Sequence, residues 1–214
     1  MFADRAGAGR ALAGALMHLR CQDPIVCGLP RGGIPVAYEV ASALGAQLDV
    51  VVVGKIGFPG QPELAMGAVG EDGARFVDER TVALAGLTPD ELAMIERAAT
   101  AKVDNRAETF RRGRSRVECA GRTVVVVDDG IATGSTARAA CQVVRAQRAA
   151  RVVLAVPVAP SGWTAMMGQV ADEYVSLESP QRMVAVGNWY VDFSATPDAE
   201  VIRCLDKSAR RHPR

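Results

Sequence analysis

Short apolar runs and longer stretches with helical spacing alternate along the chain. The apolar runs are rich in Val and Ile, are bounded by turn residues, and cover residues 25–28, 48–53, 124–127, 151–156 and 173–177. Such runs are typical of strands buried on both faces of a parallel sheet. Helical spacing covers residues 2–20, 34–44, about 88–112, 135–147, 161–170 and 197–210. This order predicts an α/β fold, with an open, mainly parallel sheet flanked by helices, in a single domain over residues 1–214.

Two helix boundaries have clear local signals. Gly45 follows the helix over residues 34–44, and glycine commonly ends a helix because it tolerates left-handed backbone. Thr88 followed by Pro89 is a typical cap and first helical position. The N-terminal helix over residues 2–20 is amphipathic, so its expected role is packing.

The most informative stretch is 122–136, RTVVVVDDGIATGST. Its valine run leads into Asp128 and Asp129 at the carboxyl end of a strand, where open α/β sheets bind ligands. Gly130 and Gly134 let backbone N–H groups approach an anion, and the following helix adds the positive end of its dipole, which together form a phosphate cradle. The two carboxylates can accept hydrogen bonds from vicinal hydroxyls or hold a hydrated cation. The pattern therefore predicts a ribose 5-phosphate site, with a structural turn and solvated acids as the alternative.

A second Gly-rich loop, Leu29-Pro30-Arg31-Gly32-Gly33, joins the first strand to the next helix. Taken alone, it is compatible with an ordinary turn that carries an exposed Arg. Its glycines would also let N–H groups face a diphosphate, and Arg31 can offer two parallel hydrogen bonds to a phosphate.

The 122–136 stretch resembles the phosphoribosyl pyrophosphate (PRPP) signature of type I phosphoribosyltransferases, which has four apolar residues, two acidic ones and a loop like G-x-x-T-G-x-T. The resemblance implies that fold, with Mg²⁺ as cofactor and PRPP as co-substrate. The residues it implies for PRPP are Asp128, Asp129, Gly130, Ile131, Ala132, Thr133, Gly134, Ser135, Thr136, Arg31, Gly32 and Gly33. Asp128 and Asp129 would meet ribose hydroxyls first and the metal second, through water.

The Gly- and Pro-rich segment after Lys55 has no clear periodicity before Ala65, and a strand and turn are expected over 67–78. The family has a lid here that closes over PRPP, so the resemblance implies a flexible lid over about 55–78. Lys55 would then lie near the pyrophosphate, whereas Glu63 is either a lid residue with a role or a surface acid.

Residues 179–193, SPQRMVAVGNWYVDF, follow the last predicted strand. In the family this region belongs to a hood that recognises the acceptor, together here with the terminal segments. The acceptor-binding candidates are Met183, Val184, Trp189, Tyr190 and Asp192. The spacing from Gly187 to Asp192 is one residue longer than in purine enzymes, and Trp189 and Tyr190 are equally compatible with a core or dimer role.

Composition excludes several other classes. A formal net charge of +1 gives no bulk attraction to nucleic acid or to an anionic membrane. The basic segment 111–116, RRGRSR, lies at a predicted helix end without interleaved aromatics, which favours a solvated face over a nucleic-acid site. Five scattered cysteines and two histidines fit neither structural zinc nor a disulfide framework. With no signal peptide and no apolar run of about 20 residues, we expect a cytoplasmic protein.

The function implied is transfer of the ribose 5-phosphate of PRPP to a nitrogen acceptor with release of pyrophosphate, with Lys55, Arg31 and Asp129 as catalytic residues. Ala132 stands where 6-oxopurine enzymes have an Asp that handles a base proton, which argues against simple purine salvage. The acceptor stays open. A PRPP-binding regulatory or sensor protein without turnover is the alternative, and competence-type relatives lie between the two. Related proteins are often dimers, so a homodimer is expected.

Overall fold

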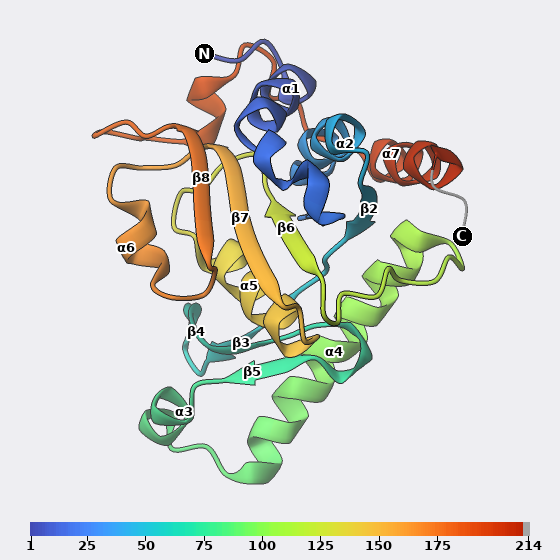
Figure 1. Cartoon of the computed structure of the whole chain (residues 1–214). Helices are drawn as coiled ribbons and strands as arrows, with labels where there is room; N and C mark the ends of the chain where they lie inside the picture. Colours follow the sequence, from blue (N-terminus) through green and yellow to red (C-terminus); the bar gives the residue numbers. More distant parts are fainter. Residues whose placement is uncertain (212–214) are drawn as a thin grey trace.

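The structure is a computed structural model that describes residues 1–211, with the side chains of residues 61–64 left out. Its centre is a five-stranded sheet of order β2-β1-β6-β7-β8 (Figure 1). The strands are β1 (Ile25–Gly28), β2 (Gln47–Val50), β6 (Thr123–Val127), β7 (Arg151–Val158) and β8 (Glu173–Glu178). All four neighbouring pairs are parallel. The predicted α/β fold is confirmed.

Helices cover both faces of this sheet, and the strand residues alternate between two cores. The helices on one face are α1 (Arg5–Ala15), α2 (Gly33–Leu44) and α7 (Asp198–Arg211), and on the other face α5 (Ser135–Ala146) and α6 (Trp163–Met167) (Figure 1). In β6, Val125 and Val127 belong to the first core, whereas Val124 and Val126 belong to the second. Because successive strand side chains point to opposite faces, an unbroken valine run can fill both cores.

A second, antiparallel sheet of order β3-β4-β5 lies beside the main sheet and contacts α4 and α5. Its elements and the helices that follow are β3 (Gly54–Phe58), β4 (Gln61–Val69), β5 (Arg75–Val77), α3 (Glu79–Ala85) and α4 (Pro89–Arg111), with a 3-10 turn at Glu71–Gly73. The strand and turn expected over 67–78 correspond to the end of β4, the 3-10 turn and β5, whereas β3 and the start of β4 are not revealed by the sequence pattern.

The strand expected over residues 48–53 is wrong at its end, because β2 stops at Val50. Val50 is the register partner of Gly28, the last residue of β1, so the edge strand has little left to pair with beyond it. Val51 and Val52 are nevertheless buried, at 5% and 4% exposure, where the backbone crosses to the second sheet. Their apolar character reflects this crossing and not a longer strand.

The helix ends largely follow the local signals. Gly45 has a φ of 66° and ends α2. Thr88 and Glu91 form a reciprocal capping box at the start of α4. The N-terminal helix is shorter than expected, because α1 gives way to a 3-10 helix at Met17–Gln22. Cys21, within this 3-10 helix, is exposed.

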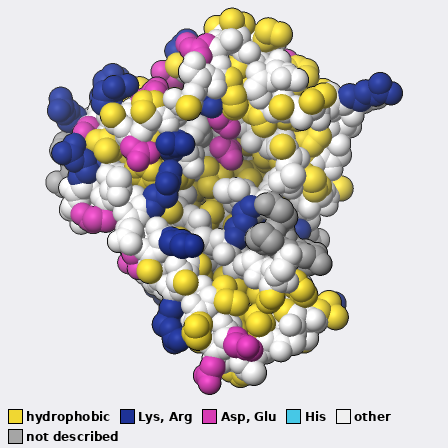
Figure 2. All heavy atoms as spheres, turned by 180° about the vertical axis from the view of Figure 1, so that it is seen from behind, with side chains coloured by type: hydrophobic (Ala, Val, Ile, Leu, Met, Phe, Trp, Pro, Cys, Tyr) yellow, Lys and Arg dark blue, Asp and Glu magenta, His cyan; other side chains and the backbone are white. Residues whose placement is uncertain are grey.

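The basic segment over 111–116 is a solvated face only in part: Arg112 is exposed as expected, whereas Arg111 is buried, which corrects the expectation for that residue. Arg111 is paired with Asp49 and Glu71 and is 6% exposed. Arg114 pairs with Asp206, and Arg116 pairs with Asp72. Viewed from behind, the molecule shows mixed acidic and basic side chains around a hollow lined by hydrophobic ones (Figure 2). Among the described residues no helix is long and apolar enough to cross a membrane.

Candidate functional site

The loop after β6 lies at the carboxyl edge of the main sheet. In that sheet, β6 has β1 on one side and β7 on the other. The N–H of Ile131 donates to the C=O of Val158 (2.9 Å), which ties the loop to the end of β7. Gly134 has a φ of 73° and directly precedes α5, so this position favours glycine. The first N–H groups of α5 therefore face the loop, which is the arrangement of an anion site.

This loop combines buried residues with exposed residues that carry hydroxyl groups. Gly130 and Gly134 are buried, as is Ile131 at 2% exposure. A Cβ on Gly130 would lie 2.5 Å from a methyl group of Val186, so the backbone passes tightly under the hood segment. Within residues 130–136, those that are exposed or half-buried are Ala132, Thr133, Ser135 and Thr136. Three of these four carry hydroxyl groups, as a phosphate cradle requires.

The loop after β1 meets the loop after β6, because these two strands are neighbours. The N–H of Leu29 donates to the C=O of Val127 at 2.8 Å. A Cβ on Gly32 would lie 2.0 Å from Oδ2 of Asp129, and one on Gly33 would lie 2.7 Å from the C=O of Val127. The structure thus brings together the two Gly-rich segments that the sequence singled out.

The two predicted cations lie in different places. The peptide bond between Pro30 and Arg31 is cis, and the Arg31 side chain is half exposed with Nη1 3.8 Å from Oδ1 of Asp198. Lys55, on β3, donates from Nζ to Oγ of Ser135 at 2.7 Å. Lys55 therefore contacts the loop that is predicted to bind the 5-phosphate, and its implied place near the pyrophosphate stays a prediction. Glu63 lies outside the residues whose side chains are described.

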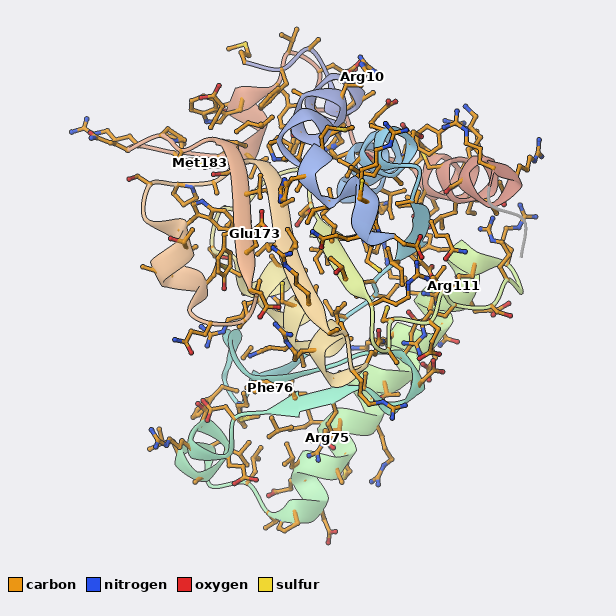
Figure 3. All side chains as sticks on the ribbon, in the orientation of Figure 1. Arg10, Arg75, Phe76, Arg111, Glu173 and Met183 are labelled. Carbon is orange, nitrogen blue, oxygen red and sulfur yellow. The ribbon has the colours of Figure 1, made fainter. Side chains whose placement is uncertain are left out.

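The hood residues differ in what they contact. Tyr190 is 5% exposed, and its hydroxyl donates to the backbone carbonyl oxygen of Asp129 at 2.6 Å. Met183 and Trp189 are half-buried, whereas Val184 is 90% exposed. Met183 lies in the loop after β8 (Figure 3). Tyr190 is thus the member of this set that is hydrogen-bonded to the loop after β6.

The Asp192 side chain forms hydrogen bonds within its own segment. Its Oδ1 accepts hydrogen bonds from the N–H (2.9 Å) and the hydroxyl (2.6 Å) of Ser194. These bonds hold the pKa of the Asp192 carboxyl below its usual value. Asp192 thus stabilises the bend after the hood, and the structure does not bring it to Asp128 or Asp129.

Arg5 is the site residue that the sequence did not point to. From the first turn of α1, its Nε donates to Oδ2 of Asp129 at 2.8 Å, and the two side chains are 12% and 15% exposed. Its guanidinium lies 3.9 Å from the ring centroid of Phe193. One arginine among several in an alanine-rich helix carries no local signal, and Asp129 is 124 positions away.

The acidic pair is electrostatically unfavourable without a ligand. Burial and the neighbouring Asp129 carboxylate raise the pKa of Asp128 well above its ordinary value, against a smaller opposing effect of the Asp129 N–H and Arg5. Burial also raises the pKa of Asp129, and the hydrogen bond and charge of Arg5 oppose that rise. A bound cation or hydroxyl donors would relieve this cost.

Asp128→Asn is expected to stabilise the ligand-free protein at pH 7. A carboxyl whose folded pKa is raised destabilises the fold progressively as the pH rises above about 4, its usual pKa. The amide removes this cost and keeps a carbonyl to accept from the Asp129 N–H. The midpoint of thermal unfolding should rise by about 2–4 °C, the shift that ~1 kcal/mol gives a protein of this size. Calorimetric scans across pH should show the gain vanishing near pH 4, and a gain of equal size at every pH would contradict the explanation.

Gly32→Ala is expected to separate the two loops. The added methyl group would overlap Oδ2 of Asp129, so either the acidic side chain or the loop after β1 must move. Ligand binding at this edge should be lost while most of the fold persists. Gly14→Ala is the matched control, because a Cβ there meets nothing within 4 Å. Binding of PRPP by Gly32→Ala at the affinity of the Gly14→Ala control would refute this prediction.

The described residues include no group of three or more His, Cys, Asp or Glu side chains placed to hold a metal ion.

The model of the phosphoribosyl transferase domain family matches residues 4–186. The chain belongs to this family. Two Mycobacterium tuberculosis proteins provisionally named phosphoribosyl transferases, MT0597 and Rv0571c, are each 50% identical over 210 residues, which is 98% of this chain. The crystal structure of TT1426 from Thermus thermophilus is similar over 97% of this chain and 98% of its own, with 42% identity and a TM-score of 0.89.

This phosphoribosyl transferase domain spans about half the length of the curated relatives it matches, since the alignment covers 47% of each. The family match includes both Gly-rich loops and residues 179–186 of the hood segment, and it begins one residue before Arg5.

Proposed function

We propose that this protein transfers the ribose 5-phosphate of PRPP to a nitrogen acceptor, with release of pyrophosphate and with magnesium as cofactor. The observation that carries the proposal is the contact of two Gly-rich loops around one acidic pair, in which Gly32 lies against Asp129. The loop after β1 would bind the diphosphate of PRPP, the acidic pair would accept hydrogen bonds from its ribose hydroxyls, and the loop after β6 would bind its 5-phosphate. All three lie at one edge of the sheet.

The 5-phosphate would bind in the cradle formed by Thr133, Gly134, Ser135 and Thr136. The N-terminus of α5 favours an anion there, and Lys55 already lies at hydrogen-bond distance from Ser135. Its ammonium group could bind a phosphate oxygen with little movement. We therefore assign Lys55 to the phosphate, and we propose that the second sheet acts as the lid over residues 55–78.

The ribose and diphosphate would lie between the loops. Asp128 and Asp129 would accept from the ribose hydroxyls, and the N–H groups of Gly32 and Gly33 would face the diphosphate. Arg31 is half exposed and forms a long ion pair of 3.8 Å with Asp198, so it is able to turn toward the departing group. The role of these residues is to orient the sugar, stabilise the diphosphate and exclude water.

Magnesium fits this donor set. Two carboxylates whose pKa values are raised by burial gain from a nearby cation, and an ion held mainly by substrate oxygens needs few protein ligands. When bound, magnesium would neutralise the diphosphate and help it to leave. Asp128 and Asp129 are the residues we expect to approach it, through water.

The acceptor would enter under the hood over residues 179–193. The Tyr190 hydroxyl already donates to the backbone of Asp129, and the Asp192 carboxylate is bound by Ser194. The remaining hood candidates, Met183, Val184 and Trp189, are therefore better placed for acceptor contacts. They offer an apolar surface for a planar base. Ala132 provides no carboxyl group to the acceptor, which favours one that already carries a nucleophilic nitrogen.

A PRPP-binding sensor without turnover is the second candidate. The commitment of Tyr190 and Asp192 to intramolecular hydrogen bonds favours it, because fewer hood groups are left to recognise an acceptor. A protein that binds PRPP but lacks acceptor contacts would still use the same loops.

The test is to incubate the protein with magnesium, PRPP and a panel of nucleobases and amines, and to measure pyrophosphate release beside PRPP binding by calorimetry. Release with one acceptor establishes the transferase. Saturable binding without release across the panel supports the sensor, and absence of binding refutes both.

We also propose that the chain acts as one phosphoribosyltransferase domain, as a homodimer, in the cytoplasm. All five cysteines are free thiols, which suits a reducing compartment. Light scattering of the purified protein would measure the assembly, and a monomeric mass at micromolar concentration would refute the dimer.

A further inference from the structure

Arg5 is a nearly buried cation at the proposed PRPP site, and the proposed function gives it no role. It comes from the N-terminal helix, outside both Gly-rich loops, and its Nε donates to Oδ2 of Asp129 at 2.8 Å. Its Nη1 donates to the C=O of Ser194 at 2.7 Å. Its flat face lies on the ring of Phe193, 3.9 Å from the centroid. Through these three contacts, one guanidinium connects Asp129 to Phe193 and Ser194 at the end of the hood.

The surroundings of Arg5 show that this joint is built from several elements. The ring of Phe193 packs on Tyr190, with centroids 5.0 Å apart, and Tyr190 packs on Phe2 at 5.5 Å. The N–H of Phe2 donates to the C=O of Trp189 (2.7 Å), and its C=O accepts from Val191 (2.8 Å). The N-terminal residues and the hood thus form one unit, in which Arg5 contacts the side chain of Asp129 and Tyr190 contacts its backbone carbonyl.

We propose that Arg5 is a positioning residue for Asp129: it holds Oδ2 so that Oδ1 is presented to a ribose hydroxyl, and it couples the hood to the acidic pair. The inference rests on the proposed function. Arg5 lies beside the loop after β1 as well, because a Cβ on Gly32 would be 3.0 Å from its Nε. It therefore stands where both loops and the hood meet.

A lysine could not make the same set of contacts. A guanidinium presents donors in fixed directions and a flat face that stacks on an aromatic ring, whereas an ammonium is a compact charge on a flexible stem. Arg5 uses Nε, Nη1 and its face at once. Lysine would keep the positive charge near Asp129 but lose the connection to Phe193 and Ser194.

The test compares Arg5→Met and Arg5→Lys with Arg10→Met. Arg10 lies on the same helix (Figure 3), is exposed, and is 3.6 Å from Glu39, so its removal matches the change in net charge away from the site. Crystal structures of the ligand-free proteins locate the Asp129 carboxylate and the Phe193 ring. Calorimetry measures the affinity for PRPP and, separately, for pyrophosphate, which has no ribose.

Arg5→Met should displace the Asp129 carboxylate from its parent position and weaken PRPP binding about tenfold, the loss that removal of one hydrogen bond to a charged group gives. Its affinity for pyrophosphate should stay that of the parent, because Asp129 is proposed to bind the ribose hydroxyls. Arg5→Lys should weaken PRPP binding about threefold, because it keeps the charge and loses the geometry.

An Asp129 carboxylate in its parent position in Arg5→Met, an unchanged PRPP affinity in both variants, or an equal loss of pyrophosphate affinity would overturn the proposal. If the parent protein itself does not bind PRPP, the proposed function fails. The ligand-free structures then decide the role of Arg5 alone.

Discussion

Asp129→Asn is expected to weaken PRPP binding tenfold or more. The substitution removes a charged acceptor for the ribose hydroxyls and breaks the ion pair with Arg5. Charge-assisted hydrogen bonds of this kind contribute about 1.5–3 kcal/mol each, and ~1.4 kcal/mol corresponds to a tenfold change in affinity. Isothermal calorimetry with magnesium and PRPP measures the effect directly.

Two comparisons make this result specific to the site. Asp104→Asn removes the same charge from an exposed position on α4, so its PRPP affinity should equal that of the parent. Asp129→Asn should also stay folded, because the backbone carbonyl of residue 129 still accepts from Tyr190. A folded Asp129→Asn protein with unchanged affinity would remove Asp129 from the proposed PRPP site.

The parts of this site that sequence could predict are local. The valine run, the two acids and the glycines of residues 124–134 lie next to one another, and each has a conformational reason: buried pleats, a strand end, and left-handed backbone at Gly134. The loop after β1 is local in the same way. That the two loops touch also follows, because parallel strands place their carboxyl ends at one edge.

The parts that could not be predicted depend on pairing between distant residues. Arg5 reaches Asp129 across 124 positions, and Lys55 reaches Ser135 across 80. Before residue 67, the second sheet has no clear sequence signal, because β3 and β4 contain Gly and Pro, which weaken a strand pattern. These strands are instead stabilised by their antiparallel backbone pairing, which joins residues that a local pattern does not connect. The run over residues 48–53 predicts one strand because apolar character does not distinguish a strand from a buried crossing.

The basic segment 111–116 shows the same limit for charge. Helix-end position gives a physical reason to expect solvated arginines, but acids from distant parts of the sequence pair with them. Arg111 makes several of these contacts. Its Nε donates to Oδ1 of Asp49 at 2.9 Å and its Nη2 to the C=O of Val50 at 2.9 Å, while Glu71 accepts from Nη1. Figure 3 shows Arg111 on α4, beside the main sheet.

The cluster of Arg111, Asp49 and Glu71 connects the two sheets. Asp49 belongs to the edge strand of the main sheet, and Glu71 begins the 3-10 turn between β4 and β5. Asp49 also accepts from the N–H groups of Val50 and Val117, both at 2.7 Å. Lys55 lies on β3, which belongs to the second sheet. By connecting the two sheets, the cluster therefore also contributes to the position of Lys55 relative to the proposed phosphate cradle.

Arg111→Met is therefore expected to destabilise the protein by about 3–5 kcal/mol, the cost of removing one partner from a buried ion pair. The Asp49 and Arg111 side chains are both only 7% exposed, so methionine would leave a buried carboxylate without its counter-charge and a C=O without its donor. Urea unfolding followed by circular dichroism measures the loss. Arg97→Met is the control on the same helix, where the side chain is exposed, and it should change stability by less than ~0.5 kcal/mol. Equal unfolding midpoints for the two variants would show that the cluster contributes no net stability, and the position of the second sheet would then depend on the apolar contacts of Ile56, Met66 and Val103.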